Sequence, residues 1–456
     1  EGDVVLVFVF LASFSLLVSR LFYRSYLSPI GVFGLIWNGL LALTEMRLIN
    51  YYPLSLEAYG AFIGSYALFL VGALLTTWPA VKRLHERPHV AYRRPLEKLI
   101  QPRKTRQLLD AMNLLGLMGL MVRIWQVGQL VGWSAVTNMS AVRSATGSLA
   151  AIEKIGGGFT GYLSSLLPLV AIIGGTYWVY FPRDWKRVIL CFVIPFGFAW
   201  LTGNRTVFIW TSVLFFFSYT LTRALGNRES AFRLLRPILL GVILLFIVFG
   251  VIGARRFDPG NYNAYHANLK LPWALTHIYS YVTSGFAAFS VHLADPVRLP
   301  IPGALTLSPA VRMLARLDPA LLGGYTYETL VTYTVRRASV TTPAATNVFT
   351  FLGQLFDDFG WGGVFLIPFF MGTVSGWIFQ RLLLRPSFGA IAWYTFFCLQ
   401  FVYASTSVIT HANSILVSMM ALALVQRLIS MGDKNVSRML PAAGSSELSE
   451  QPLCNL

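Results

Sequence analysis

The longest polar stretch of this chain, residues 254–360, lies between two strongly apolar segments. It begins Ala254-Arg255-Arg256-Phe257-Asp258 and ends Phe356-Asp357-Asp358-Phe359-Gly360. On either side of it, the sequence consists almost entirely of apolar segments of helical length with short connections. A long polar insertion on one side of such a scaffold is where chemistry or recognition concentrates. The stretch therefore divides the chain and indicates where its function lies.

The composition identifies the class of protein. Of the 456 residues, 55% are hydrophobic and 12% are charged, whereas a soluble domain carries about 25% charged residues. About eleven apolar segments are long enough, at ~17–23 residues each, to cross ~30 Å of hydrocarbon. We therefore predict an all-α, polytopic integral membrane protein. The predicted spans are centred on residues 4–19, 30–46, 58–79, 107–130, 159–181, 188–202, 206–222, 237–253, 361–383, 389–410 and 413–430.

These spans divide the chain into four predicted regions. Residues 1–253 form an N-terminal transmembrane bundle of about eight spans. Residues 254–360 form a large loop on the non-cytoplasmic side that contains an amphipathic helix, and residues 361–430 form the C-terminal transmembrane helices. Residues 431–456 form a cytoplasmic tail, whose Ser- and Glu-rich end predicts disorder.

The net charge of +17 raises the question of a nucleic-acid partner, but its distribution argues against one. The Lys and Arg residues concentrate in alternate short loops, as the positive-inside rule predicts for cytoplasmic loops. Most of the basicity therefore reports topology, and residues 254–360 are predicted to face the opposite side. The basic loops are residues 20–24, 82–106, 183–187, 223–236 and 381–385.

Two apparent motifs, and the spacing of the residues that could bind a metal, do not indicate a nucleotide-binding, kinase or metal-dependent activity. Gly156-x-Gly158-x-x-Gly161 has the spacing of a dinucleotide fingerprint, but it follows no strand and runs into an apolar span. Asp358-Phe359-Gly360 has no kinase catalytic loop with it. No Cys and His residues have zinc-ligand spacing, and there is no Asp-x-Asp pair. We therefore expect an activity that needs neither a metal nor another cofactor.

Arginines on the predicted non-cytoplasmic side run against the positive-inside trend. They are Arg143, Arg205, Arg255 and Arg256. Snorkelling to lipid headgroups would explain any one of them. However, a guanidinium also binds phosphate bidentately and stays charged at any accessible pH. A diphosphate held at this depth, with an apolar tail in the bilayer, describes a polyprenyl-diphosphate lipid.

The segment Trp273–Leu293 has the periodicity of an amphipathic helix. One stripe is apolar, and a second stripe contains His277, Tyr281, Ser284 and His292. The segment is too polar for a lipid-exposed span, so we predict a helix that lies in or re-enters the interface. It is either a cover for the bundle or a surface where His and Tyr meet a sugar.

With these features in place, the chain resembles the bacterial oligosaccharide repeat-unit polymerases, the Wzy-type O-antigen and exopolysaccharide polymerases. The resemblance covers nearly the whole hydropathy layout, but only short stretches of sequence. Those stretches are Gly203-Asn204-Arg205-Thr206, Tyr281 in its amphipathic helix, Arg312 with Gly323, Asn347-Val348-Phe349-Thr350 and Phe356-Asp357-Asp358-Phe359-Gly360-Trp361-Gly362-Gly363. The resemblance implies a glycosyltransferase C-like fold in the bacterial inner membrane, with its active site facing the periplasm.

The implied reaction joins two undecaprenyl-diphosphate-linked oligosaccharides, one as donor and one as acceptor. Cationic groups that stabilise the leaving diphosphate should contribute most, and we expect Arg205, Arg255 and Arg256 in that role. The remaining residues expected to bind substrate are Arg143, Tyr281, Arg312, Asn347 and Asp357. A chain-length-regulating co-polymerase is a candidate partner besides membrane lipid.

The acceptor hydroxyl needs a base, for which His292, Asp357 and Asp358 are the candidates. The two aspartates have an alternative role, because they could pair with an arginine structurally. Two other functions remain open as well. An O-antigen ligase uses the same lipid donor, and a flippase of lipid-linked sugars is not an enzyme. No internal repeat of the kind common in transporters is visible.

Overall fold

The computed structural model describes residues 2–49, 51–86, 101–136, 142, 163–202, 205–226, 241, 273–294, 301–325, 349–409 and 413–430. Within these residues the regular elements are helices, and no strand occurs. The α-helices are α1 (Gly2–Tyr23), α2 (Pro29–Glu45), α3 (Leu56–Glu86), α4 (Pro102–Val131), α8 (Leu167–Tyr180), α9 (Trp185–Thr202), α10 (Thr206–Gly226), α13 (Trp273–Ala294), α14 (Ser308–Leu317), α16 (Phe351–Leu384), α17 (Phe388–Tyr403) and α18 (Asn413–Ser430), with short 3-10 helices at Trp133–Ala135 and Pro319–Leu322.

The prediction of a helical membrane protein is confirmed. Five described helices are long and apolar enough to cross a membrane, and their spans are Asp3–Tyr23, Leu56–Pro79, Arg103–Val131, Thr206–Leu225 and Phe351–Leu384. Helices also occupy the other predicted spans, except residues 237–253, which lie outside the described residues apart from Gly241. The number of eleven spans and the periplasmic position of the loop stay predictions.

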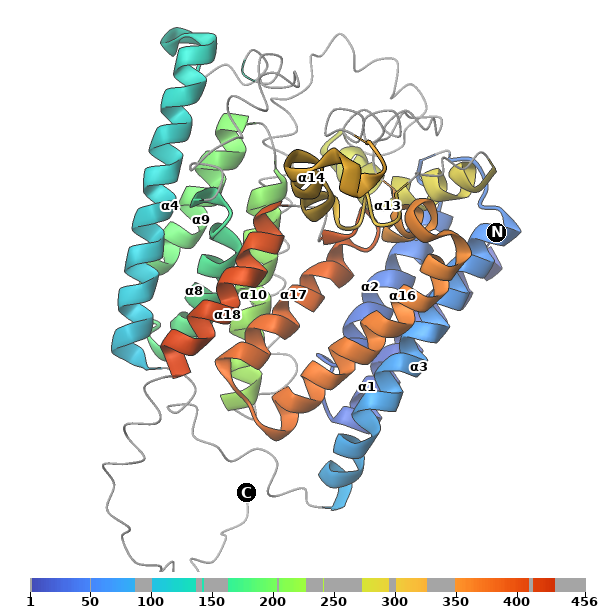
Figure 1. The fold of residues 1–456 in the computed structure, drawn as a ribbon. Coiled ribbons are helices and arrows are strands. Elements are labelled where there is room, and N and C mark those ends of the chain that lie inside the picture. The colour runs from blue at the N-terminus through green and yellow to red at the C-terminus, as the bar shows by residue number, and fades with distance from the viewer. Residues whose placement is uncertain are drawn as a thin grey trace, which may run out of the picture.

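The short connections alternate between two ends of the bundle (Figure 1). The α1–α2, α8–α9 and α16–α17 connections lie at one end, which we call the basic end. The α2–α3, α9–α10 and α17–α18 connections lie at the other end with α13 and α14, and we call it the α13 end. The basic end carries the described part of the basic loops, for example Arg24, Arg183 and Arg385. Its charge is that of a cytoplasmic face.

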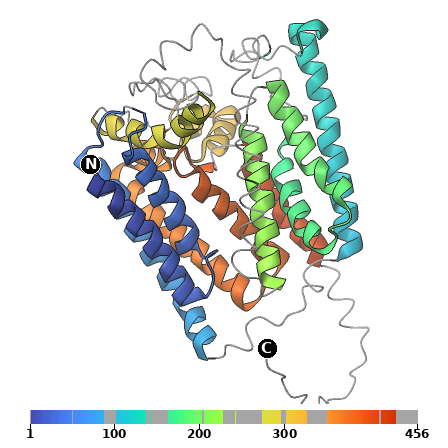
Figure 2. The ribbon, with the colours of Figure 1, turned by 180° about the vertical axis from the view of Figure 1, so that it is seen from behind.

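The helices form two groups that α17 joins. One group contains α1, α2, α3 and α16, and the other contains α4, α8, α9, α10 and α18. Helix α17 contacts α2 and α16 of the first group and α10 and α18 of the second. Both views place it between the two groups (Figure 1 and Figure 2).

Close packing of α3 on α16 depends on small residues. The sequence Gly372-x-x-x-Gly376 predicts such an approach, and the structure confirms it. A Cβ atom at Gly372 would lie 2.2 Å from the carbonyl oxygen of Phe69 on α3, and one at Gly376 would lie 2.3 Å from Thr76 Oγ1. Any larger side chain at these positions would push the two helices apart.

One face of α16 is suited to lipid contact. Leu366, Phe370 and Val374 are exposed on it, between the half-exposed indoles of Trp361 and Trp377. These two tryptophans are about 24 Å apart along the helix at 1.5 Å per residue. Tryptophans concentrate at the two interfaces of a hydrocarbon layer that is ~30 Å thick. The part of α16 before Trp361 therefore lies at the edge of the apolar layer.

Helix α13 is anchored into the α13 end by aromatic side chains. Phe286 is fully buried, and its ring centroid lies 5.1 Å from that of Trp37 on α2 and 5.3 Å from that of Phe62 on α3. Polar contacts fix the same helix to the α2–α3 connection, because the Ser290 hydroxyl accepts a 2.8 Å hydrogen bond from the Ser55 amide. Residues 283–290 are all buried, so this part of α13 is covered on every face.

Candidate functional site

The C-terminal end of α13 carries a buried histidine–carboxylate pair. Nε2 of His292 lies 2.5 Å from Oδ1 of Asp357 on α16, and both side chains are about 1% exposed. The ring of Phe349, just before α16, packs edge-on against His292 at 5.7 Å between centroids. His292 and Asp357 were each predicted as site residues from the sequence, and the structure brings them into contact. The pair holds the end of α13 against the start of α16.

The neighbouring carboxylate, Asp358, has different partners. It accepts hydrogen bonds from the backbone amides of Leu305 at 3.1 Å and Thr306 at 2.8 Å. These amides belong to the turn that leads into α14, and Asp358 is buried with them. Asp358 therefore fixes the position of α14, a role that the sequence did not predict.

Gly360 makes this arrangement possible. Its backbone has φ +62° and ψ −153°, so α16 is two helical segments joined by a kink. Non-glycine residues almost never adopt this conformation. The kink turns the first segment, with Asp357 and Asp358, away from the axis of the long apolar segment. The two carboxylates thereby reach α13 and the turn before α14.

A second cluster surrounds Arg205 at the start of α10. The Arg205 side chain is only 6% exposed, and its guanidinium carbon lies 5.9 Å from the ring centroid of Tyr281 on α13. The Tyr281 hydroxyl is close to Tyr403 at the end of α17 and to Thr206. Tyr403 in turn packs edge-on against Trp210, at 5.7 Å between ring centroids. Three helices, α10, α13 and α17, thus converge on one cation. We call Arg205, Tyr281 and Tyr403 the arginine cluster.

The electrostatics of the arginine cluster favour an anionic ligand. Helix α10 begins directly after Arg205, so the partial positive charge of its N-terminus adds to the charge of the guanidinium. Burial raises the pKa of the Tyr281 hydroxyl, and the positive charge of Arg205 offsets part of that rise. Tyr281 is therefore protonated at neutral pH and is able to donate a hydrogen bond.

The two clusters are separate. Tyr281 and His292 are eleven residues apart on α13, which corresponds to about 16 Å along the helix and to nearly the same face. Between them the helix is packed closely, because a Cβ atom at Gly285 would lie 2.0 Å from the Ser405 carbonyl oxygen. The sequence suggested that Arg205 and His292 act at one reacting centre. In the structure, Arg205 contacts the middle of α13 at Tyr281, whereas His292 lies near the C-terminal end of that helix.

The other predicted site residues are not placed by the structure. Arg143, Arg255, Arg256 and Asn347 lie outside the described residues. Arg312 is on α14, but its side chain is not described. Among the described residues, no group of three or more His, Cys, Asp or Glu side chains gathers.

Tyr403 was not predicted as a site residue, because it lies inside an apolar segment with no polar periodicity around it. No signal in the sequence connects it to Arg205, from which it is separated by almost two hundred residues.

The sequence matches no protein-family model, and no curated protein or solved structure is similar to the chain.

Proposed function

We propose that this chain is a membrane glycosyltransferase that joins polyprenyl-diphosphate-linked oligosaccharide repeat units into polysaccharide at the periplasmic face of the bacterial inner membrane. The observation that carries the proposal is the placement of Arg205. It is a buried cation at a helix N-terminus, stacked on Tyr281, at the end of the bundle opposite the basic loops. A membrane protein retains such a residue at a cost, and polar groups of this kind most often serve function.

The proposed chemistry needs few protein groups. The acceptor hydroxyl oxygen forms a bond to the anomeric carbon of the donor sugar, the bond from that carbon to the diphosphate oxygen breaks, and lipid diphosphate leaves while the hydroxyl proton passes to water. Negative charge then develops on the diphosphate. Arg205, the N-terminus of α10 and the Tyr281 hydroxyl can stabilise that charge as preorganised donors.

The separation of about 16 Å between Tyr281 and His292 along α13 changes the role expected for the His292–Asp357 pair. A base must lie within hydrogen-bond reach of the hydroxyl that attacks next to the diphosphate, whereas His292 lies about 16 Å along α13 from Tyr281, the residue that Arg205 contacts. We therefore assign the His292–Asp357 pair to positioning α13, and thereby Tyr281. The proposal assigns no described residue as proton acceptor.

The test of the proposed function is a reconstituted reaction. Purified chain in nanodiscs is given undecaprenyl-diphosphate tri- and tetrasaccharides without nucleotide sugars, and the products are measured by mass spectrometry. We expect lipid-linked products in whole multiples of the repeat unit, with one undecaprenyl diphosphate released per bond formed.

Other products would contradict the proposal. Transfer only to an added lipid A core would indicate a ligase. Movement of the lipid across liposomes without lengthening would indicate a flippase.

A further inference from the structure

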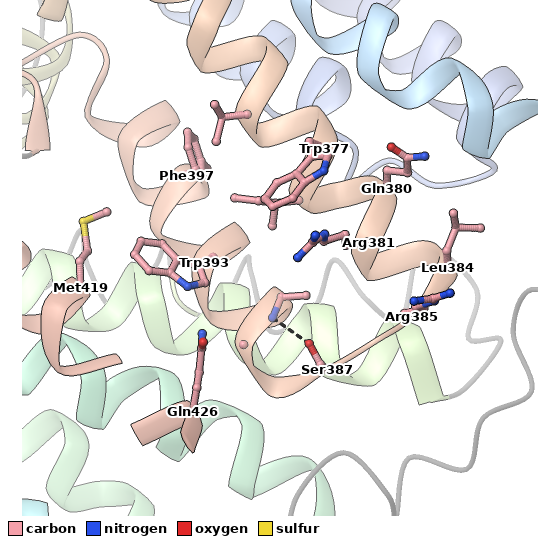
Figure 3. Close-up of a pocket in the computed structure, with 14 residues that line it drawn as sticks. Trp377, Gln380, Arg381, Leu384, Arg385, Ser387, Trp393, Phe397, Met419 and Gln426 are labelled. Carbon is pink, nitrogen blue, oxygen red and sulfur yellow. Dashed lines mark hydrogen bonds between the residues drawn. The ribbon is translucent and has the colours of Figure 1, made fainter. Parts of the chain in front are cut away.

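A groove at the basic end is formed by the last turns of α16, the first three turns of α17 and one side of α18 (Figure 3). Its volume is about 1140 Å³, larger than the ~300–1,000 Å³ typical of sites for drug-sized ligands. Along α16 it extends from Val374 to Arg385, which is about 16 Å at 1.5 Å per residue. Because Trp377 marks the edge of the hydrocarbon, the groove extends from the headgroup level into the adjoining hydrocarbon of the same leaflet.

The lining of the groove changes from apolar to cationic toward the basic end. Val374, Phe397 and Met419 line its deeper part, whereas Arg381 and Arg385 line its outer part. The lining residues include no carboxylate. Such a gradient matches an amphiphile with an apolar chain and an anionic head.

Two tryptophans, Trp377 and Trp393, lie between the apolar part and the cationic part of the groove. Arg381 stacks on the Trp377 indole, with its guanidinium carbon 3.8 Å from the ring centroid. Trp393 faces the groove from α17 (Figure 3). Stacked tryptophan and arginine are typical of the headgroup level of a membrane, so the outer part of the groove lies at that level.

A polar donor also points into the groove. The Gln426 side chain extends from α18 toward Trp393 (Figure 3). Its Nε2 atom is buried and has no hydrogen-bond partner among the described residues. A buried donor without a partner is costly, and an ester or phosphate oxygen of a bound lipid would satisfy it.

We propose that this groove binds an anionic phospholipid of the leaflet at the basic end, with its phosphate at Arg381 and Arg385 and an acyl chain along Phe397 and Met419. The site is distinct from the arginine cluster, which lies at the other end of the bundle, and the proposal does not depend on the proposed enzymatic activity. Each basic side chain near an anionic lipid contributes roughly fivefold to affinity, and two contribute about thirtyfold.

The test is a lipid titration of the purified full-length chain by native mass spectrometry, with phosphatidylglycerol and phosphatidylcholine of the same acyl composition. We expect the double variant Arg381→Gln/Arg385→Gln to bind phosphatidylglycerol about thirtyfold more weakly and to bind phosphatidylcholine unchanged. Arg183→Gln is the matched control, because Arg183 is exposed at the same end but outside the groove. We expect it to change neither affinity.

A second variant tests whether the lipid occupies the groove itself. Ala390→Trp fills the groove and leaves both arginines in place, so it should lower the affinity for both lipids. Three results would overturn the proposal. They are equal phosphatidylglycerol binding in the double variant and Arg183→Gln, unchanged binding in Ala390→Trp, or displacement of the lipid by millimolar inorganic phosphate.

Discussion

The His292–Asp357 pair offers the sharpest test of what α13 does. Both side chains are about 1% exposed and 2.5 Å apart. Removal of one partner of a buried pair costs roughly 3–5 kcal/mol, because the other partner is left buried without compensation. Replacement of both by apolar groups of similar total size is often nearly neutral. We therefore expect Asp357→Ala and His292→Leu each to destabilise the protein by several kcal/mol.

The double variant His292→Leu/Asp357→Ala should regain most of that stability. The resulting coupling energy should be at least about 2 kcal/mol. The free energy of unfolding is measured by SDS titration in mixed micelles, and the rate of product formation is measured in nanodiscs. If the pair only positions α13, the double variant should also retain at least roughly a tenth of the wild-type rate.

Two results would refute this reasoning. A double variant that is stable but loses ~10²–10⁴ in rate would show that the pair is a proton acceptor, as the sequence suggested. Single variants with unchanged stability would show that the two side chains are not coupled.

The remaining predictions concern topology and backbone geometry. A cysteine at Leu317, which is 71% exposed on α14, should react with an impermeant maleimide added outside spheroplasts, and one at Arg183 should react only after lysis; the reverse pattern would overturn the orientation. Gly360→Ala should lower the free energy of unfolding by about 1–3 kcal/mol because φ is +62°, whereas Gly362→Ala, at an open helical position, should not lower it. Gly372→Ala should cost about 1–3 kcal/mol because its Cβ would meet the α3 backbone, and full stability in this variant would contradict the packing described.

Most of the helical scaffold could be predicted from the sequence, because hydropathy over ~20 residues is a strong signal. The alternation of basic loops correctly placed Arg24, Arg183 and Arg385 at one end of the bundle. The close approach at Gly372 could also be predicted, since small residues at a spacing of four favour packing of apolar helices.

The local geometry of the site could not be predicted. The sequence predicted a span over residues 361–383, but α16 begins at Phe351 and bends at Gly360. A positive φ has no unambiguous signature in a sequence that contains several glycines nearby. Short helix α14 was missed as well, because its ten residues are far fewer than the ~20 that mark a span.

Contacts between residues far apart in the sequence explain the rest of the difference between the predicted site and the observed site. His292 and Asp357 are 65 residues apart, so their contact depends on how α13 crosses the end of the bundle. The same crossing separates Arg205 from His292 and places Arg205 on Tyr281. Residue types alone suggested a single reacting centre. In the structure, the separation of Tyr281 and His292 along α13 places these residues in two clusters.

The most direct test of the proposed function is the rate of polymer formation by Arg205→Lys. A lysine keeps the charge but loses the planar fork that holds a diphosphate bidentately. Loss of a preorganised donor to a developing anion costs roughly 3–4 kcal/mol, or ~10²–10³ in rate. Arg223→Lys is the matched control, since Arg223 also lies on α10 and stacks on a tyrosine, Tyr219, at the basic end. We predict that Arg205→Lys lowers the rate by at least ~10²-fold with normal expression and that Arg223→Lys leaves it unchanged. Full chain length and rate in Arg205→Lys would contradict the assignment of Arg205 to the lipid diphosphate.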